Sequence, residues 1–212
     1  MLSLLKIIIT QLGRTFVAKD IEKLELSNKK TQEQIEAIVI AAHRLFEKKG
    51  YEQVGMREIS AAVNKSPMQL YRLGLDKRDL LAEVILRVNA EQIKCIKPFN
   101  PNKKIAASKF IEAYLLNLYK QDIAIKSIRK EGAAFGWKWS NKYEALIIEQ
   151  LMQIIKPIAD SLTHDGYDDI QARCFGIWSL YYVGYRAAVM IDADAESCLK
   201  EIKPSLTLLL RK

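Results

Sequence analysis

The segment Ala61–Arg72, AAVNKSPMQLYR, breaks a helical pattern in a way that leaves room only for two short helices crossing steeply. Ser66 is a favourable N-cap residue, Pro67 suits the first helical position, and Gln69 stands three residues after the cap. Upstream, apolar residues recur at helical spacing as far as Asn64, a residue type that tolerates a left-handed backbone. The connection is too short for the two helices to pack side by side. The segment therefore predicts a helix-turn-helix.

Flanking patterns predict two further helices around this motif. Thr31 and Gln34 form a capping-box pattern ahead of an apolar stripe, which indicates a first helix. Downstream, Asp76 can cap a long helix that runs toward Pro98. We therefore expect four helices before Pro98.

The rest of the chain also reads as helical, without the alternating pattern of half-buried strands. Five more helices are expected, over Ile105–Tyr119, Ile123–Trp137, Tyr143–Leu162, Ile170–Ile191 and Ala195–Leu210. The predicted fold is all-α with about nine helices, a three-helix helix-turn-helix domain followed by a larger carboxy-terminal bundle. The expected division is an amino-terminal extension (1–28), the helix-turn-helix domain (29–76), a connecting helix (77–97) and a ligand-binding and dimerisation domain (98–212).

Composition narrows the functional classes. The net charge is +8, of which residues 1–97 carry +5, a mild basic excess that fits a polyanionic partner without requiring one. Three widely spaced cysteines and two histidines form no zinc-binding pattern and favour reduced thiols in a cytoplasm. The apolar run Cys174–Tyr185 is shorter than the roughly 20 residues of a membrane span, so no membrane partner is expected. No constellation suggests catalysis, and we expect neither a cofactor nor an enzyme.

Residues 35–84 contain LFEKKGYEQVGMREISAAV followed by LYRLGLDKRDLL. This stretch resembles the DNA-binding domain of the tetracycline-repressor (TetR) family of transcription regulators. Three departures from the family pattern stand out. Gly55 stands where a Ser or Thr usually caps the second helix and touches phosphate, and Asn64 with Lys65 replaces a glycine and a buried aliphatic in the turn. Gly74 replaces an aromatic after the second helix of the motif, where the neighbouring leucines are expected to supply the missing anchor.

A helix-turn-helix places its second helix in the major groove of double-stranded DNA, and the resemblance implies the same arrangement. Gln69 is expected to bond adenine in bidentate fashion and Met68 to lie against a thymine methyl. Tyr71 and Arg72 are expected to hold phosphates. The full set of expected DNA-contacting residues is Lys29, Lys30, Arg57, Ser66, Pro67, Met68, Gln69, Tyr71, Arg72 and Lys77. For each lysine alone, a solvated surface charge is an equal interpretation.

The resemblance also implies a homodimer and a small-molecule effector. The expected dimer surface joins Phe175–Met190 to Leu199–Leu210, and its named residues are Phe175, Gly176, Gly184, Ala187, Leu199 and Leu206. A helix buried within one chain is the competing interpretation. The aromatic residues expected around the effector are Tyr114, Phe135, Trp137, Trp139, Tyr143, Trp178 and Tyr182. Rings at helical spacing are more often plain core, and core is the favoured interpretation for most of them. Four residues are open choices for a polar anchor, namely Arg129, Glu131, Arg173 and His164.

These features support two functional hypotheses. The first is a cytoplasmic, ligand-responsive DNA-binding transcription regulator, expected to act as a repressor that binds a pseudo-palindromic operator as a dimer. The second is a TetR-like helical protein that binds a small apolar ligand or a partner without reading DNA.

Overall fold

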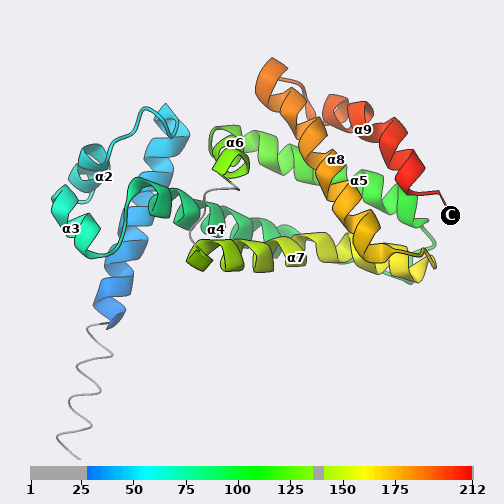
Figure 1. Cartoon of the computed structure of the whole chain (residues 1–212), viewed down its shortest axis with the longest axis horizontal. Coiled ribbons are helices and arrows are strands. Elements are labelled where there is room, and N and C mark those ends of the chain that lie inside the picture. The colour runs from blue at the N-terminus through cyan, green and yellow to red at the C-terminus, as the bar shows by residue number, and fades with distance from the viewer. Residues whose placement is uncertain (1–27, 136–140, 212) are drawn as a thin grey trace, which may run out of the picture.

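The computed structural model of the chain describes residues 28–135 and 141–211. Within these residues the fold is all α, as the sequence predicts, with a helix-turn-helix at one end and a larger bundle at the other (Figure 1). The helices are residues 28–49, α2 (Met56–Ala62), α3 (Pro67–Arg72), α4 (Lys77–Cys95), α5 (Ala107–Ala124), α6 (Lys126–Phe135), α7 (Asn141–His164), α8 (Ile170–Ile191) and α9 (Ala195–Leu209).

Local start signals have mixed success. Asp76 caps α4 as expected, because its side chain accepts from the backbone N–H of Asp79 at 2.8 Å while Asp79 bonds back to the cap. The capping box expected at Thr31 is wrong, since residues 28–30 are already helical. Nothing in those three residues breaks a helix, so the first helix runs through the position that resembles a cap.

One core holds the helix-turn-helix together. The first helix contributes Ile38 and Phe46, α2 contributes Ile59 and α3 contributes Leu70, each with no exposed surface. Burying an apolar side chain of this size stabilises a fold by about 1.5–3 kcal/mol. Because α3 is only six residues long, this burial and its caps, rather than its own length, keep it helical.

A second core lies in the back bundle, where α5, α7, α8 and α9 pack together (Figure 1). Its largest fully buried side chains are Tyr119 of α5 and Tyr181 of α8, whose rings stack 4.5 Å apart. The Tyr119 hydroxyl donates to the backbone oxygen of Tyr181 at 2.9 Å, so the buried polar group is satisfied. This bundle is therefore a separate packed core behind the helix-turn-helix.

Two helices tie the cores together. The front part of α4, including Leu80 and Ile85, belongs to the helix-turn-helix core, while Ile93 near its end packs against the back core. Ile128 of α6 is fully buried in the front core. Both helices therefore contribute side chains to the core of the helix-turn-helix.

Candidate nucleic-acid interface and buried cavity

The start of α3 is a complete capping box. Ser66 Oγ accepts from the backbone N–H of Gln69 at 3.4 Å, and Gln69 Oε1 accepts from the backbone N–H of Ser66 at 2.7 Å. Pro67 occupies the first helical position, where no N–H is needed. The short helix therefore begins at a fixed residue and presents a fixed face.

The turn before α3 ends α2 with a left-handed residue. Asn64 has φ +53°, Lys65 N donates to Ser60 O at 2.9 Å, and Asn64 N donates to Ala61 O at 3.1 Å. This is the hydrogen-bond pattern of a Schellman C-cap, which glycine usually supplies. Lys65 is half-buried and its Nζ donates to Gln34 Oε1 of the first helix at 3.4 Å. Both departures in the turn are thus accommodated.

Gly74 has a backbone conformation that would strain an aromatic residue at that position. Its φ of +73° lies in the left-handed region, and it ends α3 with the same pattern, since Leu75 N donates to Leu70 O at 3.1 Å. Leu75 is buried against the front core beside Leu70, and Leu73 packs at its edge. The neighbouring leucines supply the expected anchor.

Gly55 is the N-cap of α2 and provides no side-chain hydrogen bond. Its φ of −106° and ψ of 159° are ordinary extended values that any residue adopts. A Cβ added there would meet no atom within 4 Å. Neither the backbone conformation nor the space around Gly55 therefore requires glycine, and a serine would fit at this position.

Side chains that point away from the core form the outer face of α3. Met68 is 62% exposed and Tyr71 is 51% exposed, and Gln69 and Arg72 are also exposed. Apolar side chains held in water on a short, firmly capped helix are typical of a contact surface.

The other predicted DNA-contacting residues are divided between solvent and the protein itself. Lys29 and Lys30 are exposed on the first helix, and Arg57 is exposed on α2. Lys77 lies 4.2 Å from the ring centroid of Tyr51, and its Nζ donates to the backbone oxygen of Glu52 at 3.3 Å. Lys77 is thus already held by its own chain.

The predicted dimer residues fall into two groups. A Cβ on Gly184 would lie 2.8 Å from the backbone oxygen of Cys198, so α8 and α9 of one chain approach each other there, and Leu206 is 1% exposed. Gly176 likewise faces Leu209 of α9. For these three residues the structure favours the competing interpretation, packing within one chain. The half-buried Ala187 and Leu199 also pack against the back core, whereas Phe175 is 76% exposed.

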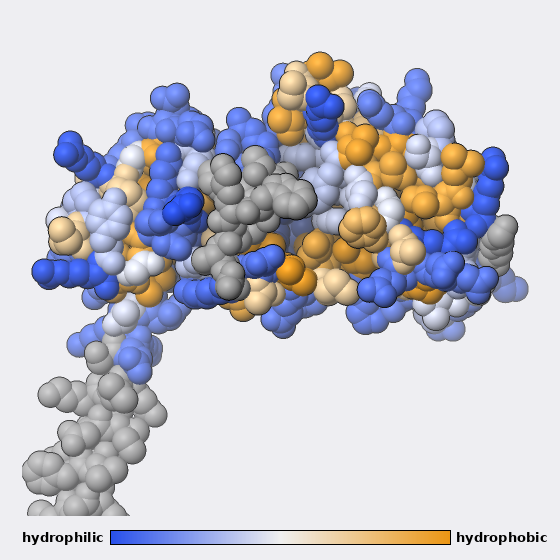
Figure 2. All heavy atoms as spheres, viewed as in Figure 1, coloured by the Kyte–Doolittle hydropathy of each residue, from blue (hydrophilic) through white to orange (hydrophobic). Residues whose placement is uncertain are grey.

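An exposed apolar strip nevertheless runs along α8. Phe175, Val183 and Met190 are 76%, 54% and 66% exposed, and Leu208 of α9 is 59% exposed. Figure 2 shows apolar side chains gathered over the α8 and α9 region. Several large apolar groups at such exposure on neighbouring helices mark a candidate interface.

The predicted aromatic residues are likewise divided. Tyr114 is a core residue whose hydroxyl donates to Ile154 O at 2.7 Å, and Tyr143 is buried with its hydroxyl on Glu83 Oε1 at 3.0 Å. Burial raises the pKa of both hydroxyls. Phe135 ends α6, whereas the predictions for Trp137 and Trp139 lie outside the described residues.

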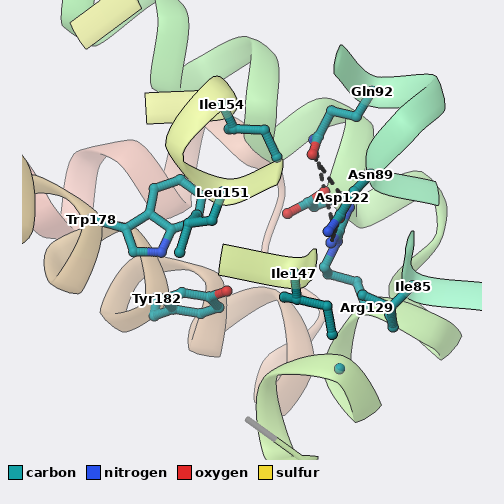
Figure 3. Close-up of a pocket in the computed structure, with 11 residues that line it drawn as sticks. Ile85, Asn89, Gln92, Asp122, Arg129, Ile147, Leu151, Ile154, Trp178 and Tyr182 are labelled. Carbon is teal, nitrogen blue, oxygen red and sulfur yellow. Dashed lines mark hydrogen bonds and ion pairs between the residues drawn. The ribbon is translucent and has the colours of Figure 1, made fainter. Parts of the chain in front are cut away.

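Trp178 and Tyr182 of α8 do line a cavity, of about 60 Å³, between α4, α5, α6, α7 and α8 (Figure 3). Its apolar wall includes Ile147, Leu151 and Ile154 of α7. Its polar wall is made of Asn89, Gln92, Asp122 and Arg129.

A buried hydrogen-bonded cluster forms that polar wall. Arg129 Nε of α6 pairs with Asp122 Oδ1 of α5 at 3.0 Å, and Arg129 Nη1 donates to Asn89 Oδ1 of α4 at 2.7 Å. Gln92 accepts from Arg129 Nη2 at 3.3 Å and donates to Asp122 at 3.1 Å, and the Tyr181 hydroxyl donates to Asp122 Oδ2 at 2.7 Å. Of the four anchors left open by the sequence, the structure brings Arg129 to the cavity.

The other members of this cluster were not predicted from the sequence. Asn89, Gln92 and Asp122 stand on helix faces whose pattern reads as ordinary polar positions. They meet Arg129 only because α4, α5 and α6 pack together. Charged groups are rarely buried unless they are paired and hydrogen-bonded, so an acidic residue at the end of one helix and a basic residue early in the next was a usable hint.

Close packing joins the cavity to α4. A Cβ on Gly132 of α6 would lie 2.6 Å from Ile85 Cδ1, so these two helices touch where the cavity begins. Ile85 is also part of the helix-turn-helix core. A movement of α6 that makes room for a ligand would therefore displace the Ile85 side chain, which is packed among residues of the front core.

A second hollow lies outside the same cluster. It is a groove of about 380 Å³ against α4 and α5, and its wall includes His43 of the first helix as well as Arg129. Burial lowers the pKa of His43, and Arg87 acts in the same direction while Glu47 opposes it. The groove faces the junction between the helix-turn-helix and the back bundle.

Two general features restrict other kinds of site. Within residues 28–135 and 141–211, no three side chains of the His, Cys, Asp or Glu types gather closely enough to bind a metal ion. Among the described helices, none has both the length and the hydropathy that a bilayer crossing requires.

Comparisons with known proteins agree with the architecture. The family model "Bacterial regulatory proteins, tetR family" matches residues 38–84. No curated protein matches the chain.

Solved structures resemble nearly the whole described chain. The transcriptional regulator FadR from Bacillus subtilis, solved in complex with stearoyl-CoA, is 15% identical with a TM-score of 0.61, covering 83% of this chain and 97% of its own. A tetR-family regulatory protein from Rhodococcus RHA1 is 21% identical with a TM-score of 0.61, covering 83% and 96%. Salmonella enterica GusR is 19% identical with a TM-score of 0.58, covering 84% and 95%. Residues 38–84 therefore match the model of the tetR family of bacterial regulatory proteins, and the chain has the fold of solved TetR-family regulators.

Proposed function

We propose that this protein is a ligand-responsive DNA-binding transcription regulator that acts as a repressor and binds a pseudo-palindromic operator as a two-fold dimer. Residues 29–76 would bind DNA, and residues 98–212 would bind the effector and the second chain. Residues 77–97 would form the helix that connects these two domains. The observation that carries the proposal is the outer face of α3, with Met68, Gln69, Tyr71 and Arg72 exposed on a helix fixed at both ends.

The chemistry of that face suits base edges and phosphates. A glutamine amide can bond adenine N6 and N7, and the Met68 side chain offers an apolar contact to a thymine methyl. The Arg72 guanidinium and the Tyr71 hydroxyl can donate to phosphates, which position the helix without reading sequence. Lys29, Lys30 and Arg57 add positive charge around it, so binding must weaken as salt rises.

Reading more than a few base pairs requires a second copy. Paired helix-turn-helix domains bind half-sites about 34–36 Å apart. The strip of Phe175, Val183 and Met190 on α8, with Leu208 on α9, is the surface we assign to the dimer. The strip lies on α8 and α9 in the back bundle, away from α3, so a dimer formed through it would leave α3 of each copy uncovered (Figure 1).

Ligand response follows from the size of the cavity and the identity of its walls. The cavity of about 60 Å³ is much smaller than the roughly 300 Å³ at which small-molecule sites begin, so an effector must part its walls. Ile85 and Asn89 on one wall belong to α4, whose front half is built into the helix-turn-helix core. An effector that separates α6 from α4 would therefore move the DNA-binding face. The complex of FadR with stearoyl-CoA supports effector binding by this fold.

The experiment is to find the DNA that the protein protects in its own genome. Sheared genomic DNA is incubated with the full chain, retained fragments are sequenced, and their protected region is mapped. A single inverted-repeat site that controls the expression of an adjacent reporter gene supports the proposal. A repressor would lower the expression of that reporter. No retained fragment, or fragments without a common site, would contradict it.

The alternative of a TetR-like protein that binds an apolar ligand without reading DNA is favoured by one observation. Gly55 deprives α2 of the hydroxyl that usually caps it and touches phosphate. Arg72→Ala separates the hypotheses, because reporter control should collapse in a regulator and stay unchanged in a carrier. Neither hypothesis needs an enzyme activity, and both place the protein in the cytoplasm.

A further inference from the structure

The donor and acceptor groups around the buried cavity define the kind of effector it can take. This inference rests on the proposed function, since it concerns the ligand of the same site. Asn89, Gln92, Asp122 and Arg129 are 4%, 9%, 4% and 8% exposed, so these polar groups depend on one another and on whatever enters the cavity. Buried polar groups that lack partners are costly, and an occupant that pairs with them gains affinity.

Acceptors in the cluster are in use. Asp122 Oδ1 accepts from Gln92 Nε2 and is ion-paired with Arg129 Nε, and Asp122 Oδ2 accepts from the Tyr181 hydroxyl. The side-chain oxygens of Asn89 and Gln92 each accept from Arg129. Each of these oxygens therefore already accepts a hydrogen bond, so a ligand donor would add only a second bond, whereas a ligand acceptor would satisfy the unbonded Nε of Arg129.

Donors, in contrast, are in surplus. A guanidinium has five N–H groups, and Arg129 donates two hydrogen bonds, from Nη1 to Asn89 and from Nη2 to Gln92. Its buried Nε is ion-paired with Asp122 but has no hydrogen-bond partner. Among the described residues, the other N–H groups of Arg129 and the side-chain NH₂ of Asn89 donate no hydrogen bond. Both residues line the cavity (Figure 3). A ligand with an acceptor oxygen would therefore satisfy these donors.

Charge in the cavity is balanced. Among the described residues that line it, the one positive side chain, Arg129, is paired with the one negative side chain, Asp122, at 3.0 Å. A carboxylate ligand would leave a net buried negative charge and an amine a net buried positive charge, and either is expensive in a site of this burial. The rest of the wall, with Trp178, Tyr182 and Leu151, suits an apolar body.

We infer that the effector is an uncharged, largely apolar molecule that carries a carbonyl or similar acceptor oxygen. Its oxygen accepts from the free N–H groups of Arg129 and Asn89, and its apolar part lies against Trp178 and Leu151. The Asp122–Arg129 pair excludes charged analogues of the same shape.

Four probes with the same phenylalkyl body test this directly. They are benzylacetone, which is neutral and has a carbonyl, phenylbutyrate, phenylbutylamine and butylbenzene. Calorimetric titration of the full chain at neutral pH should give benzylacetone an affinity about tenfold above each of the others, the factor expected of one buried hydrogen bond. A charged probe that binds as tightly as benzylacetone, or the absence of binding by all four, would overturn the inference.

Two nearly isosteric variants then reverse the charge preference. Asp122→Asn leaves Arg129 unbalanced and should make phenylbutyrate the preferred probe, while Asn89→Asp adds a negative charge, removes two donors and should favour phenylbutylamine. An unchanged ranking in folded variants would contradict the inference. If either variant fails to fold by thermal melting, the ranking in the natural chain still decides. DNA retention without probes is measured in parallel, so failure here is separable from failure of the regulator proposal.

Discussion

Gln69 Oε1 accepts a hydrogen bond from the backbone N–H of Ser66 at 2.7 Å, and so the residue expected to read adenine also starts its own helix. The oxygen keeps a second lone pair and the amide NH₂ is exposed, so the two roles compete without excluding each other. Recognition by this residue is therefore coupled to the stability of α3.

Replacing Gln69 in two ways separates the roles. Gln69→Glu keeps an oxygen for the capping box and places negative charge at a helix start, so the free energy of unfolding should hold or rise slightly. It removes the amide donor and repels phosphate, so operator affinity should fall by about 1–3 kcal/mol. Gln69→Ala should lose both stability and affinity. Urea unfolding and DNA titration give the two readings, and a Glu variant with natural affinity would remove Gln69 from base recognition.

Two glycines in the helix-turn-helix should respond in opposite directions to serine. Gly55→Ser has room and an ordinary backbone, so it should add a few tenths of a kcal/mol through N-capping, and its hydroxyl should tighten DNA binding severalfold. Gly74→Ser, at φ +73°, should cost about 1–2 kcal/mol because an L side chain strains that conformation. Equal effects of the two changes on the urea midpoint would refute the assignment of these caps.

The contact between Gly132 and Ile85 predicts a rescue. Gly132→Ala brings a methyl 2.6 Å from Ile85 Cδ1 and should cost about 1–3 kcal/mol of stability by overpacking. It should also push α6 from α4 and lower operator affinity without any ligand. Ile85→Val removes Cδ1, so the double variant should recover much of both losses, with a coupling of about 0.5–3 kcal/mol. Purely additive effects would show that this contact does not link the cavity to the DNA-binding face.

Phe175 should control assembly. Phe175→Glu places a charge in the strip assigned to the dimer, so sedimentation should show monomers and operator binding should weaken strongly. Met152→Glu on α7 is the matched control, since Met152 is 62% exposed outside that strip and should leave assembly unchanged. If both variants stay dimeric, the interface lies elsewhere.

His43 predicts a pH dependence of stability. Burial sets its folded pKa below the usual 6.5, so the unfolded chain binds the proton more readily. The stability that neutral His43 contributes is complete above the unfolded pKa, and it is lost as the pH falls through 6.5 toward the folded pKa. Between about pH 5 and pH 8, the urea midpoint of His43→Gln should change less with pH than the urea midpoint of the natural chain. The same slope in natural and variant chains would exclude His43 as its source.

Local signals allowed the helix-turn-helix to be predicted residue by residue. Ser66, Pro67 and Asp76 act through backbone groups a few positions away, so their roles are written in consecutive sequence. Thr31 shows the limit of such signals, because the same pattern occurs inside a helix that starts earlier. Gly184 shows another, since a small residue reveals close approach but not whether the neighbour belongs to the same chain.

The cavity could be predicted only in outline. Aromatic residues suggested its location, yet of the described ones only Trp178 and Tyr182 have side chains in its wall, while Tyr114 and Tyr143 are core. The contacts between Arg129 and Asn89 span 40 positions in the chain and depend on how three helices pack. Such a cluster has no local pattern, and structure is needed to find it.

The central claim, that paired copies of α3 bind one duplex, is tested most directly by the affinity of the full chain for its retained DNA fragment across salt concentrations. The account predicts that the logarithm of the association constant falls linearly with the logarithm of salt concentration, and that Arg72→Ala makes the slope shallower by about one. Affinity that does not change with salt, or an Arg72→Ala variant with the natural slope and affinity, would contradict it.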